Sequence, residues 1–242
     1  MEIYFTDVNE WSEEDAYQSM LPFVPEARRE RLSRCRSAAD RARGLGAGLL
    51  LEYGLRKRGI TLLQETAGYE TAELKNGPYG KPCLQGGYGI CFNLSHAGEY
   101  AAAVFAEHEA GIDIERIRTA KQGLADRFFT EAEAAYVRRC ADGGEGDLAF
   151  TRIWTRKESC IKAAGEGMRL PLDSFDVLCD ELTLPGKCAE GGVHAGAGYG
   201  FYTVRQPEGY VLSVCAERTD REDIVLRPVT CGAIREYLEG GG

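Results

Sequence analysis

The most informative stretch of the sequence is Gly111-Ile112-Asp113-Ile114-Glu115, in which isoleucines alternate with acidic residues. This alternation predicts a half-buried β-strand, because successive side chains of a strand point to opposite faces. The two isoleucines would face the core, and the carboxylates of Asp113 and Glu115 would project together from the other face. We expect two similar α+β halves to meet near residues 105–112.

Apolar spacing and turn residues predict the elements on both sides of this strand. Upstream, we expect a helical region over residues 26–58, a polar turn over 95–99, and strands at 2–8, 90–94 and 100–106. Downstream, Thr130 and Glu133 have the spacing of a helix-capping box, and a second helix over 148–164 should stop at Gly165. Further strands are expected near 175–178, 200–205, 210–216 and 224–228.

The composition is that of an ordinary globular protein with an excess of acid. The 242 residues include 29 basic and 38 acidic side chains, which gives a formal charge of −9. A chain of this length can form one large domain or two small ones. The negative charge argues against nucleic acid and anionic membranes as partners, since both attract basic surfaces. No apolar stretch approaches membrane-spanning length.

Cysteine usage indicates the compartment. The nine cysteines are odd in number and include no C-x-x-C pair, so neither a zinc site of the usual spacing nor a disulfide framework is predicted. The first residues do not combine a basic segment with an apolar run, as a secretory signal would. We therefore expect a reducing, cytoplasmic location.

The carboxylates of Asp113 and Glu115 are the first candidates for chemistry. Two like charges held close together raise each other's pKa unless a cation or hydrogen-bond donors compensate. Oxygen ligands of this kind suit Mg²⁺, which binds a few carboxylates together with substrate phosphates. The alternative is a solvent-facing edge strand with two ordinary charges, because D-x-E tripeptides are common.

The helix expected over 148–164 carries a second candidate group. Glu158 and Lys162 are four residues apart and therefore neighbours on one face, with Trp154 one turn earlier and Lys157 as a further positive charge nearby. A carboxylate could complete a metal site, and an ammonium could neutralise a departing phosphate. The alternative is a surface ion pair of small energetic value.

Two further features of the sequence could bind a phosphate group. Phe92-Asn93-Leu94-Ser95-His96 ends a predicted strand with an amide, a hydroxyl and an imidazole, although His96 could equally be an ordinary turn residue. The region over 26–58 carries seven arginines in its first half, and Lys81 lies in a turn-rich loop. Taken alone, such a basic run is usually a solvated face.

Together, these motifs resemble the Sfp-type 4′-phosphopantetheinyl transferases over nearly the whole chain. The matching patterns are Gly80-Lys81-Pro82, Phe92-Asn93-Leu94-Ser95-His96, Gly111-Ile112-Asp113-Ile114-Glu115, and Trp154-Thr155-Arg156-Lys157-Glu158-Ser159-Cys160-Ile161-Lys162 followed by Gly165-x-Gly167. The resemblance implies an α+β fold of two similar α/β halves related by pseudo-twofold symmetry. Residues 1–107 would form the half with coenzyme A-binding residues, and residues 108–242 the half with metal-binding and catalytic residues.

The resemblance also implies a reaction. The 4′-phosphopantetheine moiety of coenzyme A would pass to a serine of an apo acyl or peptidyl carrier protein, with release of adenosine 3′,5′-bisphosphate. Mg²⁺, or Mn²⁺ in its place, would be held by Asp113, Glu115 and Glu158. The catalytic residues would be Glu158, Lys162 and Asp113. Coenzyme A would be bound by Arg43, Lys81, Ser95, His96, Asp113, Glu158 and Lys162. The protein would be a monomer without a nucleic-acid or membrane partner.

Several alternatives stay open at this point. The base for the carrier serine could be Glu158 or a metal-bound water. Ala27 occupies a position that is often basic in the family, so Arg43 is the best-placed arginine for coenzyme A. The carrier could serve fatty-acid, polyketide or non-ribosomal peptide synthesis. The alternative functions are a non-catalytic coenzyme A- or nucleotide-binding protein and another Mg²⁺-dependent phosphoryl-transfer enzyme.

Overall fold

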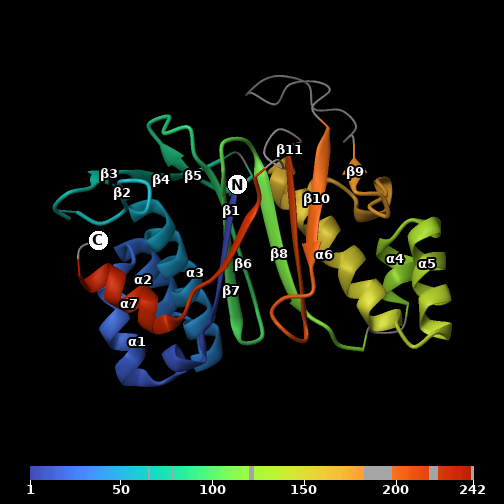
Figure 1. The fold of residues 1–242 in the computed structure, drawn as a ribbon, viewed down its shortest axis with the longest axis horizontal. Coiled ribbons are helices and arrows are strands. Elements are labelled where there is room, and N and C mark those ends of the chain that lie inside the picture. Colours follow the sequence, from blue (N-terminus) through green and yellow to red (C-terminus); the bar gives the residue numbers. More distant parts are fainter. Residues whose placement is uncertain (65, 78, 120–122, 183–197, 218–222, 241–242) are drawn as a thin grey trace.

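The chain forms a layered α+β structure in which two four-stranded sheets lie between two groups of helices (Figure 1). This architecture is that of a computed structural model. It describes residues 1–64, 66–77, 79–119, 123–182, 198–217 and 223–240. None of the helices within these ranges is long and apolar enough to cross a membrane.

The first sheet contains the strand order β12-β1-β7-β6. Its strands are β1 (Glu2–Asp7), β6 (Cys91–Ala97), β7 (Tyr100–Ala106) and β12 (Val225–Pro228). β1 is antiparallel to β7 and parallel to β12, and β6 is antiparallel to β7. Alternating residues of β1 serve two cores, since Tyr4 packs on the helices while Ile3 and Phe5 face the second sheet.

The second sheet is antiparallel, with the order β8-β11-β10-β9. Its strands are β8 (Ala110–Arg116), β9 (Glu181–Leu182), β10 (Tyr199–Val204) and β11 (Tyr210–Glu217). Ile112 and Ile114 of β8 are buried between the sheets, where they pack in one apolar cluster with Ala102 and Val104 of β7. The predicted direction of the two isoleucines is thereby confirmed.

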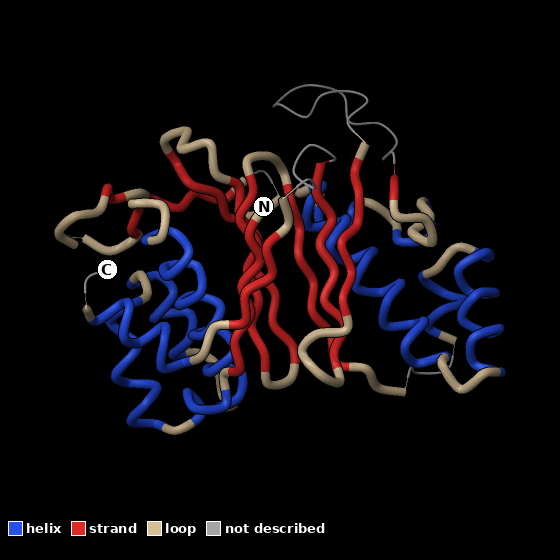
Figure 2. Tube along the Cα trace, in the orientation of Figure 1, coloured by secondary structure: helices blue, strands red, loops and turns tan. Residues whose placement is uncertain are grey.

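Helices cover the outer face of each sheet (Figure 2). On the side of the first sheet lie α1 (Glu14–Met20), α2 (Glu26–Ser33), α3 (Ala38–Arg56) and α7 (Cys231–Glu239). On the side of the second lie α4 (Leu124–Phe128), α5 (Glu131–Asp142) and α6 (Gly146–Ala164). Short 3₁₀ helices span Asn9–Ser12, Leu21–Phe23, Gly167–Arg169 and Leu172–Ser174.

Two small ribbons complete the described structure. β2 (Ile60–Thr61) pairs in parallel with β3 (Glu70–Thr71), and β4 (Glu73–Asn76) pairs antiparallel with β5 (Pro82–Gln85). The ribbon of β4 and β5 leads through its turn to Lys81, which therefore reaches the body of the protein from outside the two large sheets.

Gly111 allows α6 to lie directly on β8. A Cβ atom at Gly111 would stand 2.1 Å from the carbonyl oxygen of Ser159 and 2.3 Å from the backbone nitrogen of Ala163. Both are backbone atoms and cannot move aside as a flexible side chain can, so only glycine fits here. This close approach brings the strand that carries Asp113 against the helix that carries Glu158 and Lys162.

Several predicted elements are confirmed and others are corrected. Thr130 and Glu133 form both bonds of the capping box, and Gly165 ends α6 in the left-handed conformation. The single helical region over 26–58 is wrong, because the chain breaks after α2 and Ser37 caps a separate α3. The polar turn over 95–99 is also wrong. β6 continues to Ala97, and only Gly98 and Glu99 turn the chain.

The C-terminal part of the chain adds two further differences. The strand expected at 175–178 is absent from the described structure, whereas helix α7 was not predicted. β12 and α7 return to the first sheet, where Ile234 and Leu238 of α7 are buried in the N-terminal core. The division into residues 1–107 and 108–242 stays a prediction, and these two elements of the second range pack on the first.

Candidate active site

Side chains of β6 hold the edge of β8, although the two strands belong to different sheets. The amide oxygen of Asn93 accepts a hydrogen bond from the backbone N–H of Ile112 at 3.0 Å. The hydroxyl oxygen of Ser95 accepts one from the backbone N–H of Ile114 at 3.3 Å. Asn93 and Ser95 are two residues apart on β6, and Ile112 and Ile114 are two apart on β8, so both contacts lie on the same face of the two pleated strands. Asp113 lies between the two bonded positions.

Asp113 is buried, with 5% of its surface exposed. Its Oδ1 atom accepts hydrogen bonds from the Ser95 hydroxyl at 2.9 Å and from the Lys162 ammonium at 2.7 Å. Its Oδ2 atom is also buried but has no hydrogen-bond partner among the described residues. A buried, unpaired carboxylate oxygen costs free energy. Asp113 therefore presents one oxygen that a ligand could satisfy.

Lys162 projects from α6 toward the edge of β8. Its Nζ atom donates to the carbonyl oxygen of Ile112 at 3.0 Å, to the Ser95 hydroxyl at 3.1 Å and to Asp113 Oδ1 at 2.7 Å. These three contacts use the three protons of the ammonium. Asp113 and Lys162, which the family resemblance assigned to one site, are in direct contact.

Glu115 and Glu158 lie within electrostatic range of Asp113. Burial raises the pKa of Glu158 above its usual value, and repulsion from Asp113 adds to the effect while Lys162 opposes it. Burial likewise raises the pKa of Glu115, followed by repulsion from Asp113, with Arg118 and Lys162 in opposition. The three predicted carboxylates therefore form one cluster of interacting acids.

The cluster is not a preformed metal cage. No group of three or more His, Cys, Asp or Glu side chains within the described ranges is placed to hold a metal ion. The donor set is nevertheless entirely carboxylate oxygen, the type that Mg²⁺ prefers. A divalent cation bound here would give Oδ2 of Asp113 a partner, and its charge would oppose the rise in pKa that burial and Asp113 cause at Glu115 and Glu158.

Basic groups gather beside the turn that follows β6. His96 is exposed at one side, but partial burial of its imidazole, followed by the nearby positive charge of Arg43, lowers the pKa of the ring. Arg43 of α3 donates to the carbonyl oxygen of Gly98 at 3.0 Å and forms an ion pair with Asp40. Lys162 and Arg28 also lower the pKa of His96, which places four basic groups in one neighbourhood.

Lys81 approaches β8 and α6 from the turn between β4 and β5. Its ammonium forms an ion pair with Glu109 at 2.5 Å and donates to the carbonyl oxygens of Ala110 at 3.2 Å and Ala163 at 3.4 Å. Lys81 therefore lies where β8 begins and α6 ends. Asp113 follows Ala110 by three residues along the strand, and Lys162 precedes Ala163 by one along the helix.

Two basic residues of the α6 motif point away from this site. Lys157 was expected to add positive charge there, but it is fully buried and pairs with Glu133 at 2.8 Å. It also donates to the carbonyl oxygens of Leu172 and Phe175, each at 2.6 Å. The expectation is wrong because α6 presents Lys157 to the segment that follows it in sequence.

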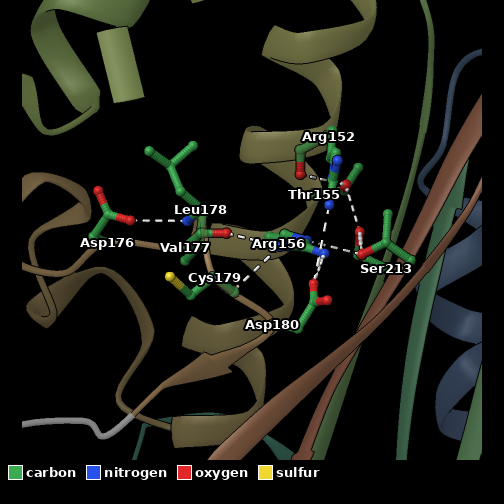
Figure 3. A network of polar contacts seen from close by, with 10 residues as sticks. Arg152, Thr155, Arg156, Asp176, Val177, Leu178, Cys179, Asp180 and Ser213 are labelled. Carbon is green, nitrogen blue, oxygen red and sulfur yellow. Dashed lines mark hydrogen bonds and ion pairs between the residues drawn. The ribbon is translucent and has the colours of Figure 1, made fainter. Parts of the chain in front are cut away.

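Arg156 ties the same segment to the second sheet (Figure 3). Its guanidinium donates to the carbonyl oxygen of Val177 at 2.9 Å, to Asp180 at 2.6 Å and to the Thr203 hydroxyl at 3.0 Å. The carbonyl oxygen of Val177 thus accepts its hydrogen bond from Arg156 of α6 and not from a neighbouring strand. This accounts for the absence of the strand predicted at 175–178. Arg156 and Lys157 support the fold around α6.

A hollow of about 410 Å³ opens beside Glu115, and sequence reasoning missed most of its lining. The lining residues are Glu115, Arg116, Arg118, Thr119, Leu124, Phe150, Thr151 and Trp154. Phe150 and Trp154 stack with their ring centroids 5.9 Å apart. Their i, i+4 spacing on α6 indicated only a shared helix face, and nothing in the pattern indicated that the face is partly open.

Comparison with known proteins identifies the family to which this chain is similar. Residues 109–215 match the family model of the 4′-phosphopantetheinyl transferase superfamily. The chain is 30% identical over 232 residues to 4′-phosphopantetheinyl transferase Sfp of Bacillus subtilis (strain 168), covering 93% of this chain and 97% of the relative. A second 4′-phosphopantetheinyl transferase of Bacillus subtilis is 32% identical over 229 residues, covering 91% and 87%. This chain belongs to the 4′-phosphopantetheinyl transferase superfamily and is similar to its Sfp-type members over nearly its whole length.

Proposed function

We propose that this enzyme transfers the 4′-phosphopantetheine moiety of coenzyme A to a serine of an apo acyl or peptidyl carrier protein. The observation that carries the proposal is Asp113, whose buried free oxygen lies beside Lys162 and two further carboxylates. In the reaction, the serine oxygen forms a bond to the phosphorus that bears the pantetheine. The bridging P–O bond breaks, and adenosine 3′,5′-bisphosphate leaves with the electron pair.

Asp113, Glu115 and Glu158 would hold Mg²⁺ or Mn²⁺ in this enzyme. Binding would require Glu115 and Glu158 to turn toward the free Oδ2 atom of Asp113. A bound divalent ion spreads the negative charge of a diphosphate, which otherwise repels a nucleophile. The raised pKa values of the two glutamates support this assignment, because the charge of a bound cation would oppose the effects of burial and of Asp113 that raise them.

Glu158 and Lys162 would serve the two ends of the transfer. Serine is a weak nucleophile until its proton is accepted. Glu158, a carboxylate within electrostatic range of Asp113, would accept that proton. Lys162 stands beside Asp113 with its positive charge and would stabilise the charge that develops on the leaving phosphate.

Arg43, Lys81 and His96 would bind the phosphates of coenzyme A. Arg43 and His96 lie close enough for the guanidinium to lower the imidazole pKa, so an anion between them would relieve mutual repulsion. Lys81 is held at the end of α6 by the carbonyl oxygen of Ala163. Ser95 was also expected to contact coenzyme A, but its hydroxyl is engaged with Asp113, Lys162 and the backbone of β8.

The wider architecture is proposed on the same basis. The two four-stranded sheets, each covered by a helix of 19 residues, support halves related by pseudo-twofold symmetry. Residues 1–107 would supply most coenzyme A contacts, and residues 108–242 the metal-binding and catalytic groups. We place the enzyme in the cytoplasm as a monomer, and the net charge of −9 supports the absence of nucleic-acid and membrane partners.

Mass spectrometry of carrier proteins tests this function. A small panel of apo carriers from fatty-acid, polyketide and peptide synthesis would be incubated with coenzyme A, Mg²⁺ and the enzyme. At least one carrier should gain one phosphopantetheine, and the same carrier with its acceptor serine changed to alanine should gain none. Hydrolysis of coenzyme A without modification of any carrier would contradict the proposal.

A further inference from the structure

Tyr210, the first residue of β11, holds the turn between β6 and β7 from the opposite sheet. Its side chain is buried, with 3% of its surface exposed. The phenol oxygen donates to Oε2 of Glu99 at 2.8 Å and accepts from the backbone N–H of Glu99 at 3.1 Å. One hydroxyl therefore holds both the side chain and the backbone of Glu99, at the end of the sheets where the turn lies beside the start of β11 (Figure 1).

The turn is shaped to receive this hydroxyl. Gly98 has a φ of +54°, and a Cβ atom there would stand 2.1 Å from the phenol oxygen of Tyr210. A side chain at this position would displace the phenol from Glu99. The ring of Tyr100 packs edge-to-face on that of Tyr210, with the centroids 4.9 Å apart. The carbonyl oxygen of Glu99 accepts from the backbone N–H of Val8 at 2.8 Å, so the turn is fixed from several sides.

The same turn holds Arg43, which the function proposed above assigns to the phosphates of coenzyme A. Nη1 of Arg43 donates to the carbonyl oxygen of Gly98 at 3.0 Å, and Nη2 pairs with Asp40. His96 lies two residues before Gly98 on β6, close enough to Arg43 for that charge to lower the pKa of its imidazole. A shift of the turn would therefore move Arg43 and His96 relative to each other.

We propose that Tyr210 is a positioning residue for coenzyme A, which fixes the β6–β7 turn and thereby the relative places of Arg43 and His96. The proposal rests on the function proposed above. Tyr210 also draws the Glu99 carboxylate toward the second sheet, where Arg116, its paired position on β8, contacts the other carboxylate oxygen at 3.7 Å. A carboxylate released beside two basic groups would compete with a phosphate for them. Coenzyme A binding would thus depend on a contact between the two sheets.

Tyr210→Phe tests the hydroxyl alone, since the ring and its packing on Tyr100 are kept. The affinity for coenzyme A, measured by calorimetry without a carrier, should fall about three- to tenfold, and KM for coenzyme A should rise by the same factor. The kcat at saturating coenzyme A should stay within about twofold of wild type, because the metal-binding groups are not moved. Unchanged affinity and KM, or a fall in kcat alone, would overturn the proposal.

A double-mutant cycle shows whether Tyr210 acts through the basic group that the turn holds. Arg43→Ala should weaken coenzyme A binding by itself. Adding Tyr210→Phe to Arg43→Ala should weaken it by less than Tyr210→Phe does in the wild type, because the turn then has no guanidinium to place. Effects of the two changes that multiply in full would overturn the proposal, since they would show that Tyr210 acts independently of Arg43.

Tyr199→Phe is the matched control. Tyr199 of β10 is buried, with 1% of its surface exposed, but its hydroxyl has no hydrogen-bond partner among the described residues. Its loss should leave coenzyme A affinity and kcat at the wild-type level.

A second variant covers poor folding of Tyr210→Phe. Glu99→Ala removes the carboxylate that accepts from the phenol and should also weaken coenzyme A binding, and wild-type affinity in this variant would overturn the proposal. A wild type that modifies no carrier would contradict the proposed function instead, and the calorimetric comparison would still test Tyr210.

Discussion

Asp113 and Lys162 form an ion pair that satisfies only one side of the carboxylate. Lys162 and Ser95 reach Oδ1, and Oδ2 is left buried without a partner among the described residues. Sequence spacing paired Asp113 with Glu115 and Glu158 with Lys162, and the family resemblance implied that the two pairs belong to one site. Neither could predict which oxygen stays free, since that depends on a hydroxyl contributed by another strand.

Replacing Asp113 by asparagine should remove activity without unfolding the protein. The amide keeps the shape of the side chain, but it removes the negative charge beside Lys162 and the oxygen offered to a cation. We expect kcat to fall at least about 100-fold, an effect of about 3 kcal/mol on the barrier. Initial rates of carrier modification at saturating Mg²⁺ measure this. Asp126→Asn, at an exposed ion pair with Arg138, should keep the wild-type rate.

Replacing Glu158 by glutamine should stabilise the metal-free protein while impairing catalysis. The raised pKa means that the folded state holds a proton that the unfolded chain releases, so the free energy of unfolding falls as pH rises from about 4.5 through the raised value. Glu158→Gln avoids this loss. In EDTA at pH 7.5 its melting temperature should exceed that of wild type, and the difference should vanish near pH 4. A lower melting temperature at pH 7.5 would contradict the assigned cause.

At the level of elements, the contact between β8 and α6 positions the site. Alternation predicted β8, and apolar spacing with a glycine stop predicted α6, because both signals lie within one short window. The break between α2 and α3 was missed because a basic run looks helical throughout. The strand expected at 175–178 was wrong because Arg156 and Lys157, distant in sequence, bind that segment instead.

Gly111→Ala should force β8 and α6 apart. The added methyl group would meet two backbone atoms of α6 at 2.1 and 2.3 Å, so the helix must shift and carry Lys162 away from Asp113. Overpacking of this kind costs about 1–3 kcal/mol or more. We expect a lower melting temperature and at least tenfold slower transfer. Gly232→Ala in α7 is the control, since its nearest neighbour lies 4.0 Å away. Equal behaviour of the two variants would refute this packing argument.

At the scale of the whole molecule, the last described elements, β12 and α7, pack against the N-terminal part of the chain. β12 pairs with β1, and Arg56 of α3 donates to the carbonyl oxygen of Leu238 in α7 at 3.0 Å. The two predicted halves are therefore linked at the sheet junction and by this returning segment. A strand near 224–228 was expected, but no local pattern shows that a strand pairs with residues more than 200 positions earlier. The pairing of β12 with β1 could therefore not be predicted.

Deleting residues 223–242 should prevent stable folding. Ile234 and Leu238 are buried, and removing two such side chains forfeits about 3–6 kcal/mol, a large part of the stability of a typical domain. The deletion also exposes the edge of β1. Soluble yield and thermal melting would report the loss. Deleting only 241–242 should preserve both, because the bond that closes α7 ends at Gly240. A full-length melting temperature in the longer deletion would contradict the structural role.

The most direct measurement follows both products of one reaction. An apo carrier is incubated with coenzyme A and Mg²⁺, its intact mass is recorded, and adenosine 3′,5′-bisphosphate is quantified in the same sample. With wild type, each phosphopantetheine gained by the carrier should be matched by one released adenosine 3′,5′-bisphosphate, and Asp113→Asn should yield neither. Unmodified carriers across the panel, or equal product from wild type and Asp113→Asn, would contradict the central claim.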